Sequence, residues 1–159
     1  MFKNYYLAYG SNLNLNQISR RCYDVKTIGS IELNDYRLVY KGRSDNFAYL
    51  TIEPYQGPIV PIGVFEVSSL DINCLDIYEG YPTTYSKCYI PIKIGKKIKN
   101  ALIYVMNEQF SYHLPSINYI KTCMRGYKDF EFDMSILDKA LEDTLIVNQK
   151  KKFIKNVNF

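Results

Sequence analysis

The pattern of apolar and polar residues predicts mainly β-strands along the first two thirds of the chain and helices towards its end. Residues 2–9 are aromatic and apolar and predict a first strand, which runs into a turn at residues 10–12. Pro54 is expected to end a later strand, and Pro61 and Gly63 indicate a bulge or an edge position in the strand after it. The further strands are predicted at residues 31–40, 47–53, 59–67, 85–94 and 98–106, the last two as a hairpin.

Four helices are predicted from capping residues and from helical spacing. Asn14 can cap a first helix that ends near Arg21. Ser69 can cap a second helix over residues 70–78, which Gly80 terminates. The remaining two are predicted from Ser116 to about Gly126 and from Asp133 or Ser135 onward, with Leu137, Leu141 and Leu145 at helical spacing.

This order of elements predicts an α+β protein. Many short strands around a small core favour a small, mostly antiparallel β-barrel with surrounding helices. The chain has 159 residues, which suits one domain. We expect residues 1–148 to form that single domain and residues 149–159 to form a basic C-terminal tail.

Composition narrows the class of protein without identifying it. Hydrophobic residues make up 47% and charged residues 23% of the chain, as in ordinary globular proteins. The formal net charge is +4, and much of the excess lies in Lys150, Lys151, Lys152 and Lys155. A nucleic-acid accessory protein would use such a run, but we interpret it as a solvated end. We therefore expect neither a nucleic-acid partner nor a membrane partner.

The cysteines and the start of the chain predict a cytoplasmic protein. Cys22, Cys74, Cys88 and Cys123 are widely separated and form no C-x-x-C pair, so we expect neither a zinc site nor another metal site. Lys3 interrupts the first apolar stretch, so we expect no signal peptide. Reduced thiols in the cytoplasm are the simplest account.

The turn between the first strand and the first helix is one candidate site. Gly10 lets the backbone approach a ligand, and exposed N–H groups at a helix start favour an anion. Ser11 and Asn12 can add side-chain hydrogen bonds. Glycine, serine and asparagine are also common turn residues, so these residues alone leave a plain capped turn as an alternative.

Glu79 is the candidate acid or base. It lies at the predicted end of a helix beside Tyr78 and Tyr81, and dehydration by aromatic rings raises the pKa of a carboxyl group. Asp76, three residues earlier, is expected to raise that pKa further. A surface glutamate is the alternative. The single histidine, His113, precedes Pro115 in a predicted loop, and we interpret it as structural or exposed.

Taken together, these segments resemble the gamma-glutamyl cyclotransferase family, including its gamma-glutamylamine branch. The family's opening Y-G-S-N-L motif matches residues 9–13 within YLAYGSNL at 6–13, and its L-D-x-x-E-G segment matches Leu75-Asp76 and Glu79-Gly80. Residues 115–119 look like its P-S-x-x-Y segment. The segment after Glu79 looks more like the γ-glutamylamine branch, whereas residues 115–119 look more like the branch acting on γ-glutamyl amino acids, so the leaving group stays open.

The resemblance implies a reaction that needs no metal and no cofactor. A γ-glutamyl compound would cyclise to 5-oxoproline and release an amine or amino acid, with Glu79 as general acid/base. The alternative is a non-catalytic module that binds a small anion on the same fold. A homodimer is left open. The residues implied to bind the γ-glutamyl substrate are Tyr6, Leu7, Ala8, Tyr9, Gly10, Ser11, Asn12 and Tyr119.

Overall fold

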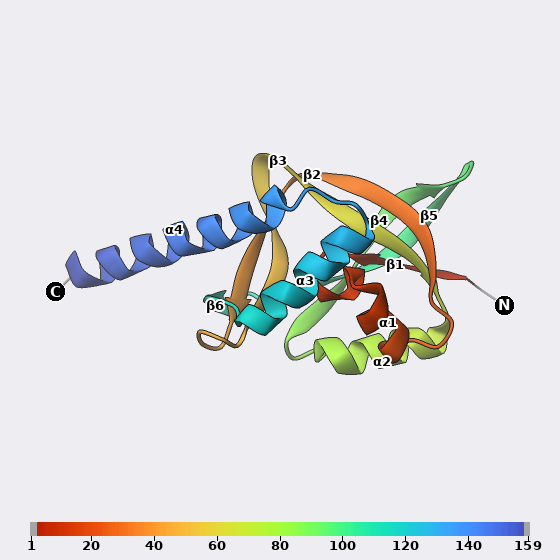
Figure 1. Cartoon of the computed structure of the whole chain (residues 1–159), viewed down its shortest axis with the longest axis horizontal. Coiled ribbons are helices and arrows are strands. Elements are labelled where there is room, and N and C mark those ends of the chain that lie inside the picture. The colour runs from red at the N-terminus through yellow and green to blue at the C-terminus, as the bar shows by residue number, and fades with distance from the viewer. Residues whose placement is uncertain (1–2, 158–159) are drawn as a thin grey trace.

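The computed structural model describes residues 3–157, and within this range the chain forms six strands and four α-helices (Figure 1). A short 3-10 helix, η1, follows the first strand. In chain order the elements are β1 (Asn4–Ala8), η1 (Ser11–Leu13), α1 (Leu15–Arg21), β2 (Lys26–Gly42), β3 (Ala48–Val67), α2 (Ser69–Glu79), β4 (Tyr85–Ile94), β5 (Lys97–Met106), β6 (Ser111–Tyr112), α3 (Ile117–Asp129) and α4 (Ser135–Val157).

The strands form one mixed sheet in the order β4-β5-β1-β3-β2-β6. β1 runs antiparallel to β3 but parallel to β5, so the α+β prediction is confirmed and the antiparallel barrel is corrected. Among the described residues no pairing joins the edge strands β4 and β6, so the sheet is not closed into a barrel. β6 has only two residues, too few to provide a ladder for closure.

The long β2–β3 hairpin differs from the prediction of two separate strands around Pro54. β3 continues through this position, because the irregularity is absorbed by a bulge. Tyr36 pairs with Pro54 and Asn34 with Ile59, so residues 55–58 face the single residue Asp35. The Asp35 carboxylate accepts a hydrogen bond from the backbone N–H of Gly57 at 2.9 Å, which holds the extra residues in place.

The predicted helix caps are largely confirmed. The Asn14 side chain accepts from the N–H of Gln17 at 3.1 Å, and Ser116 caps α3 in the same way. The second helix is capped by Ser68 rather than Ser69. Ser68 Oγ accepts from the N–H of Asp71 at 3.1 Å, and the Asp71 carboxylate accepts from the Ser68 N–H at 3.0 Å, which forms a capping box.

The last helix, α4, begins at Ser135 and ends at Val157, so residues 149–157 of the expected basic tail are helical. Residues 158–159 of that tail and Phe2 of the first predicted strand lie outside the described residues. Figure 1 shows its C-terminal half extending beyond the sheet, away from α1, α2 and α3. Those three helices gather around the end of β1. No helix in the part of the chain described by the structure is long and apolar enough to cross a membrane.

Candidate active site

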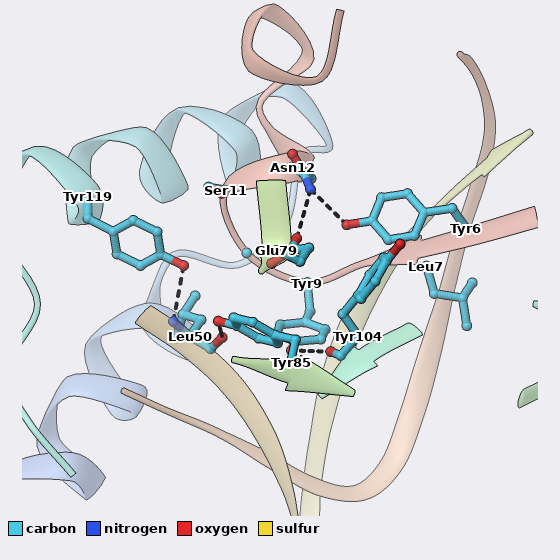
Figure 2. Close-up of a pocket in the computed structure, with 11 residues that line it drawn as sticks. Tyr6, Leu7, Tyr9, Ser11, Asn12, Leu50, Glu79, Tyr85, Tyr104 and Tyr119 are labelled. Atoms are coloured by element: carbon cyan, nitrogen blue, oxygen red, sulfur yellow. Dashed lines mark hydrogen bonds between the residues drawn. The ribbon is translucent and has the colours of Figure 1, made fainter. Parts of the chain in front are cut away.

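The candidate site forms where the end of the central strand β1 meets the end of α2. β1 is buried between β3 and β5 and leads directly into Gly10 and η1. Glu79 is the last residue of α2, and Gly80 ends that helix in the left-handed conformation with φ 65°. Gly80 is suited to this position because a Cβ disfavours positive φ. The sequence thus brings Glu79 against the turn after β1 (Figure 2).

Two adjoining cavities meet at Glu79. The inner cavity has a volume of about 30 Å³ and the outer cavity about 260 Å³. Ser11, Glu79, Tyr85 and Tyr119 line both, so the carboxylate stands at their junction. The inner cavity has room for a single small polar group, such as a carboxylate or carbonyl oxygen, while the outer one has room for a larger group.

The environment of Glu79 suits proton transfer. Burial raises the pKa of its carboxyl group from 4.5 to about 7, and the positive charge of Arg21 acts in the opposite direction. The Asn12 amide donates a hydrogen bond to Glu79 Oε1 at 3.2 Å. We expected Asp76 to raise this pKa further, and it does not. Its carboxylate instead accepts hydrogen bonds from Lys87 Nζ at 2.6 Å and from the Tyr104 hydroxyl at 2.5 Å.

Arg21 fixes the orientation of the Asn12 amide. Its guanidinium donates to Asn12 Oδ1, so the Asn12 NH₂ group is left to donate to Glu79 and, at 2.9 Å, to the Tyr6 hydroxyl. Arg21 is itself held by Gln17 Oε1 at 3.0 Å and by stacking on the Tyr78 ring at 3.4 Å. Figure 2 shows Asn12 between Glu79 and Tyr6, as this chain of hydrogen bonds requires.

The turn after β1 carries backbone donors that the fold itself does not use. Within residues 3–157, the N–H groups of Gly10, Ser11 and Asn12 have no hydrogen-bond acceptor, whereas the Leu13 N–H donates to the Gly10 carbonyl at 3.0 Å. The first N–H groups of a helix lack partners in the same way. All three residues line the inner cavity. They therefore offer donors suited to an anion or to a carbonyl that gains negative charge.

Tyrosine hydroxyls form much of the remaining wall. Tyr119 accepts from the backbone N–H of Leu50 at 3.0 Å, and Tyr85 donates to the Leu50 carbonyl at 2.9 Å. Tyr9 donates to the Tyr104 carbonyl at 2.5 Å. Burial raises the pKa of Tyr85 and Tyr119 well above its ordinary value. These hydroxyls therefore stay protonated at neutral pH and leave Glu79 as the group that titrates.

The structure brings most of the predicted site residues together. The inner cavity is lined by the predicted residues Tyr6, Leu7, Tyr9, Gly10, Ser11, Asn12, Glu79 and Tyr119. Ala8 is buried in β1 and is not among the described residues that line it. His113 lies elsewhere, with its ring between Asp45 and Ser111.

Sequence reasoning missed Arg21, Leu50, Tyr85 and Tyr104 as parts of the site. Leu50, Tyr85 and Tyr104 lie on β3, β4 and β5, and the only available signal was the alternation of large side chains along those strands. Arg21 is the last residue of α1, the short helix that follows the turn containing Asn12. The shortness of that helix was the only sequence signal that Arg21 could reach Asn12. Among residues 3–157, no group of three His, Cys, Asp or Glu side chains could hold a metal ion.

Comparison with known proteins defines the class. The model of the family described as "Gamma-glutamyl cyclotransferase, AIG2-like" matches residues 6–121, which include the turn after β1, Glu79 and Tyr119. The chain therefore belongs to this family. No curated protein sequence matches it.

Solved structures show the same fold. One gamma-glutamyl cyclotransferase is 23% identical, with a TM-score of 0.72 over 87% of this chain and 86% of that one. The uncharacterized protein loc79017 from Homo sapiens is 24% identical, with a TM-score of 0.71 over the same shares. YkqA from Bacillus subtilis is 15% identical, with a TM-score of 0.70 over 91% of this chain and 55% of its own. At these identities the similarity establishes the fold.

Proposed function

We propose that this chain is a γ-glutamyl cyclotransferase. It converts a γ-glutamyl amino acid or γ-glutamyl amine to 5-oxoproline and releases the amino acid or amine. The observation that carries the proposal is Glu79, a carboxyl group with a pKa of about 7 at the junction of two cavities. A general acid/base works best when its pKa lies near the working pH.

The nucleophile in this reaction is the substrate's own α-amine. An α-amine has an ordinary pKa of about 8, so it must lose a proton before it attacks. Glu79 takes that proton, and the amine nitrogen then bonds to the γ-carbonyl carbon. The bond from that carbon to the leaving nitrogen breaks as Glu79 returns the proton to that nitrogen. The ring nitrogen then loses its second proton through Glu79 to the released amine, which departs as the ammonium form. The pKa of Glu79 lies about one unit below that of the attacking amine, so the first transfer is only slightly uphill.

The unused donors after β1 serve the negative charges of the substrate. The α-carboxylate needs an anion site, and the γ-carbonyl oxygen gains negative charge as the ring closes. The N–H groups of Gly10, Ser11 and Asn12 are suited to both. Folding the glutamyl chain against this turn brings amine and carbonyl together, and orientation of this kind supplies much of the acceleration of a ring closure.

The two cavities divide the substrate between them. The glutamyl end lies against the turn after β1 with one polar group in the inner cavity, and the leaving group extends into the outer cavity beside Tyr49 and Tyr78. Glu79 borders both cavities, so it can reach the attacking amine and the leaving nitrogen in turn.

The proposal is tested by incubating the protein with a panel of γ-glutamyl amino acids, γ-glutamyl amines and glutathione, and measuring 5-oxoproline by mass spectrometry. Glu79→Gln keeps the size of the side chain but cannot transfer the proton, and we expect it to fold and to lose turnover by at least about a hundredfold. Glu108→Gln, at an exposed site, is the matched control and is expected to keep full activity.

Near-wild-type turnover of Glu79→Gln would overturn the role of Glu79. Binding of a γ-glutamyl compound by the folded wild type without release of 5-oxoproline would instead support the non-catalytic small-anion binding module.

A further inference from the structure

The outer cavity, which receives the leaving group under the proposed function, has one charged side chain in its wall. Within residues 3–157 the residues that line it are Ser11, Tyr49, Tyr78, Glu79, Gly80, Thr84, Tyr85 and Tyr119. Glu79 is the charged one, and it must be ionised to accept the proton of the attacking amine. A group that enters this cavity therefore meets a negative charge and no positive one.

The cationic side chains near this cavity are engaged with other partners. Arg21 donates to Asn12 Oδ1 and lies over the Tyr78 ring at 3.4 Å. Lys87 Nζ lies 2.6 Å from the Asp76 carboxylate. Neither cation is among the described residues that line the outer cavity. The part of the chain that the structure describes thus provides no counterion for an anionic leaving group.

A leaving amino acid would place its α-carboxylate beside Glu79. That carboxylate carbon is two bonds from the leaving nitrogen, and Glu79 has to come within hydrogen-bond distance of the same nitrogen. Two carboxylates this close repel each other, and the entering one also loses its hydration. Of the turn residues with free N–H groups, Gly10 and Asn12 line the inner cavity alone, which leaves their donors to the glutamyl end. An amine without a carboxylate avoids this conflict.

Two half-exposed tyrosine rings form part of the outer wall. Tyr49 and Tyr78 both line the outer cavity, and they are 39% and 44% exposed. Each is held in place. The Tyr49 ring meets the Tyr119 ring edge-on with centroids 5.1 Å apart, and the Tyr78 hydroxyl lies 3.2 Å from Ser11 Oγ. Fixed aromatic rings that border a cavity favour a flat ring as their partner.

We propose that the leaving group is an aromatic amine that carries no carboxylate, with Tyr49 and Tyr78 in contact with its ring. This inference rests on the proposed function and names the leaving group within it. The bonds made and broken are those of the cyclisation, so the products are 5-oxoproline and the aromatic amine in its ammonium form.

The first test compares kcat/KM of the wild type for three substrates by release of 5-oxoproline. γ-Glutamylphenethylamine and γ-glutamylphenylalanine differ only in the α-carboxylate of the leaving group. γ-Glutamylbutylamine has an aliphatic chain in place of the ring. We expect the phenethylamine compound to exceed the phenylalanine compound by at least about thirtyfold and the butylamine compound by at least about tenfold.

The second test supplies the missing cation. Thr84 lines the outer cavity, so Thr84→Lys adds an ammonium group to its wall. We expect kcat/KM for γ-glutamylphenylalanine to rise relative to that for γ-glutamylphenethylamine by at least about fivefold. Thr84→Met adds a side chain of similar length without the charge. Thr83→Lys adds the same charge at an exposed position outside the cavity, and both controls should keep the wild-type ratio within about twofold.

The third test removes one of the rings. Tyr49→Leu is expected to reduce the preference for γ-glutamylphenethylamine over γ-glutamylbutylamine by at least about threefold, because the aromatic contact is lost. Tyr55→Leu removes a half-exposed ring from the same strand, β3, outside both cavities, and should leave this preference unchanged.

The outcomes separate this inference from the proposed function. Turnover of γ-glutamylphenylalanine as fast as that of γ-glutamylphenethylamine would overturn the exclusion of the carboxylate, and equal turnover of γ-glutamylbutylamine would overturn the aromatic contact. In both cases the cyclotransferase function would stand. Release of 5-oxoproline from the wider panel but from none of these three would also overturn the inference alone. Absence of 5-oxoproline from every substrate would overturn the proposed function and the inference with it.

Discussion

At the scale of single residues, the candidate site depends on a hydrogen-bond chain in which each member limits the next. Arg21 holds Asn12 Oδ1, and Asn12 can therefore present only its NH₂ group to Glu79. Arg21 also lowers the pKa of Glu79 against the effect of burial. We therefore interpret Arg21 as a positioning residue that acts through Asn12 and through its charge.

Replacing Arg21 by methionine is expected to shift the pH dependence of turnover. The group that must be ionised to accept the amine proton is Glu79, so kcat/KM should rise with pH through a midpoint near its pKa of about 7. Without the arginine charge this pKa rises, the midpoint moves to higher pH, and kcat/KM at pH 7 falls by about three- to tenfold. Arg20→Met removes the same charge from the exposed neighbouring position and is the control. An unchanged midpoint in Arg21→Met would contradict the positioning role.

The raised pKa of Glu79 also predicts a cost in stability. The folded-state pKa of about 7 lies above the ordinary value of 4.5, so between these values the native state binds more protons than the unfolded state. The free energy of unfolding therefore falls as pH rises from 4.5 through 7, by about 3 kcal/mol from this group. Glu79→Gln resembles the protonated form and escapes this loss.

We expect Glu79→Gln to equal the wild type in urea unfolding at pH 4 and to be the more stable protein at pH 8, by up to about 3 kcal/mol. Glu108→Gln should follow the wild type at both values. A difference between Glu79→Gln and the wild type that does not change with pH would show that the carboxylate is not destabilised in the folded protein.

At the scale of elements, α2 carries Glu79 at its last position and is fixed at its start by the capping box of Ser68 and Asp71. The Asp71 carboxylate is fully buried and also accepts from the Tyr23 N–H at 2.6 Å, so the start of α2 is tied to the end of α1. Through this tie, the helix that holds Glu79 and the helix that holds Arg21 keep a fixed spacing.

Removing the cap hydroxyl with Ser68→Ala is expected to lower the free energy of unfolding by about 1 kcal/mol. Ser69→Ala, one residue later and exposed, is the matched control and should lie within about 0.5 kcal/mol of the wild type. Urea unfolding of both variants decides between the two serines. If both variants lost the same free energy of unfolding, the Ser68 hydroxyl would contribute no specific capping energy.

The elements that could be predicted from the sequence are those with local causes. Asn14 and Ser116 were found as caps because a cap and its N–H partner lie three residues apart. Ser68 was missed by one position because Ser68 and Ser69 both fit that pattern. Pro54 was expected to end the strand, which is wrong, because the strand continues through a bulge whose form depends on the pairing with β2.

The candidate site was predictable only where its residues are close together in the sequence. Gly10, Ser11 and Asn12 form one short segment, and their position after a buried strand indicated a site. Asp76 was misjudged because its partners Lys87 and Tyr104 come from β4 and β5, and strand pairing sets that contact. The open mixed sheet had the same origin, because the parallel β1–β5 pairing joins segments almost a hundred residues apart, Tyr5 with Ala101.

At the scale of the whole molecule, α3 packs directly against the segment that follows the turn after β1. Gly126 of α3 lies so close to this turn that a Cβ added to it would stand 2.5 Å from the Asn14 backbone N and 2.7 Å from the Leu13 backbone C. Asn14 also donates from its side chain to the Thr122 carbonyl at 3.2 Å. The helix that carries Tyr119 therefore packs directly on the segment that follows Asn12.

Gly126→Ala tests this packing by the sign of its effect. In an exposed helix interior, alanine in place of glycine stabilises by about 0.5–1 kcal/mol. Here the Cβ meets backbone atoms that cannot move aside, so we expect the free energy of unfolding to fall by about 1–3 kcal/mol. Because the turn between Gly10 and Asn12 must shift with Leu13, kcat/KM for release of 5-oxoproline should fall as well, with Met124→Ala at an exposed position of the same helix as the control. A stabilised Gly126→Ala with full activity would mean that α3 can move away from the turn without disturbing the site.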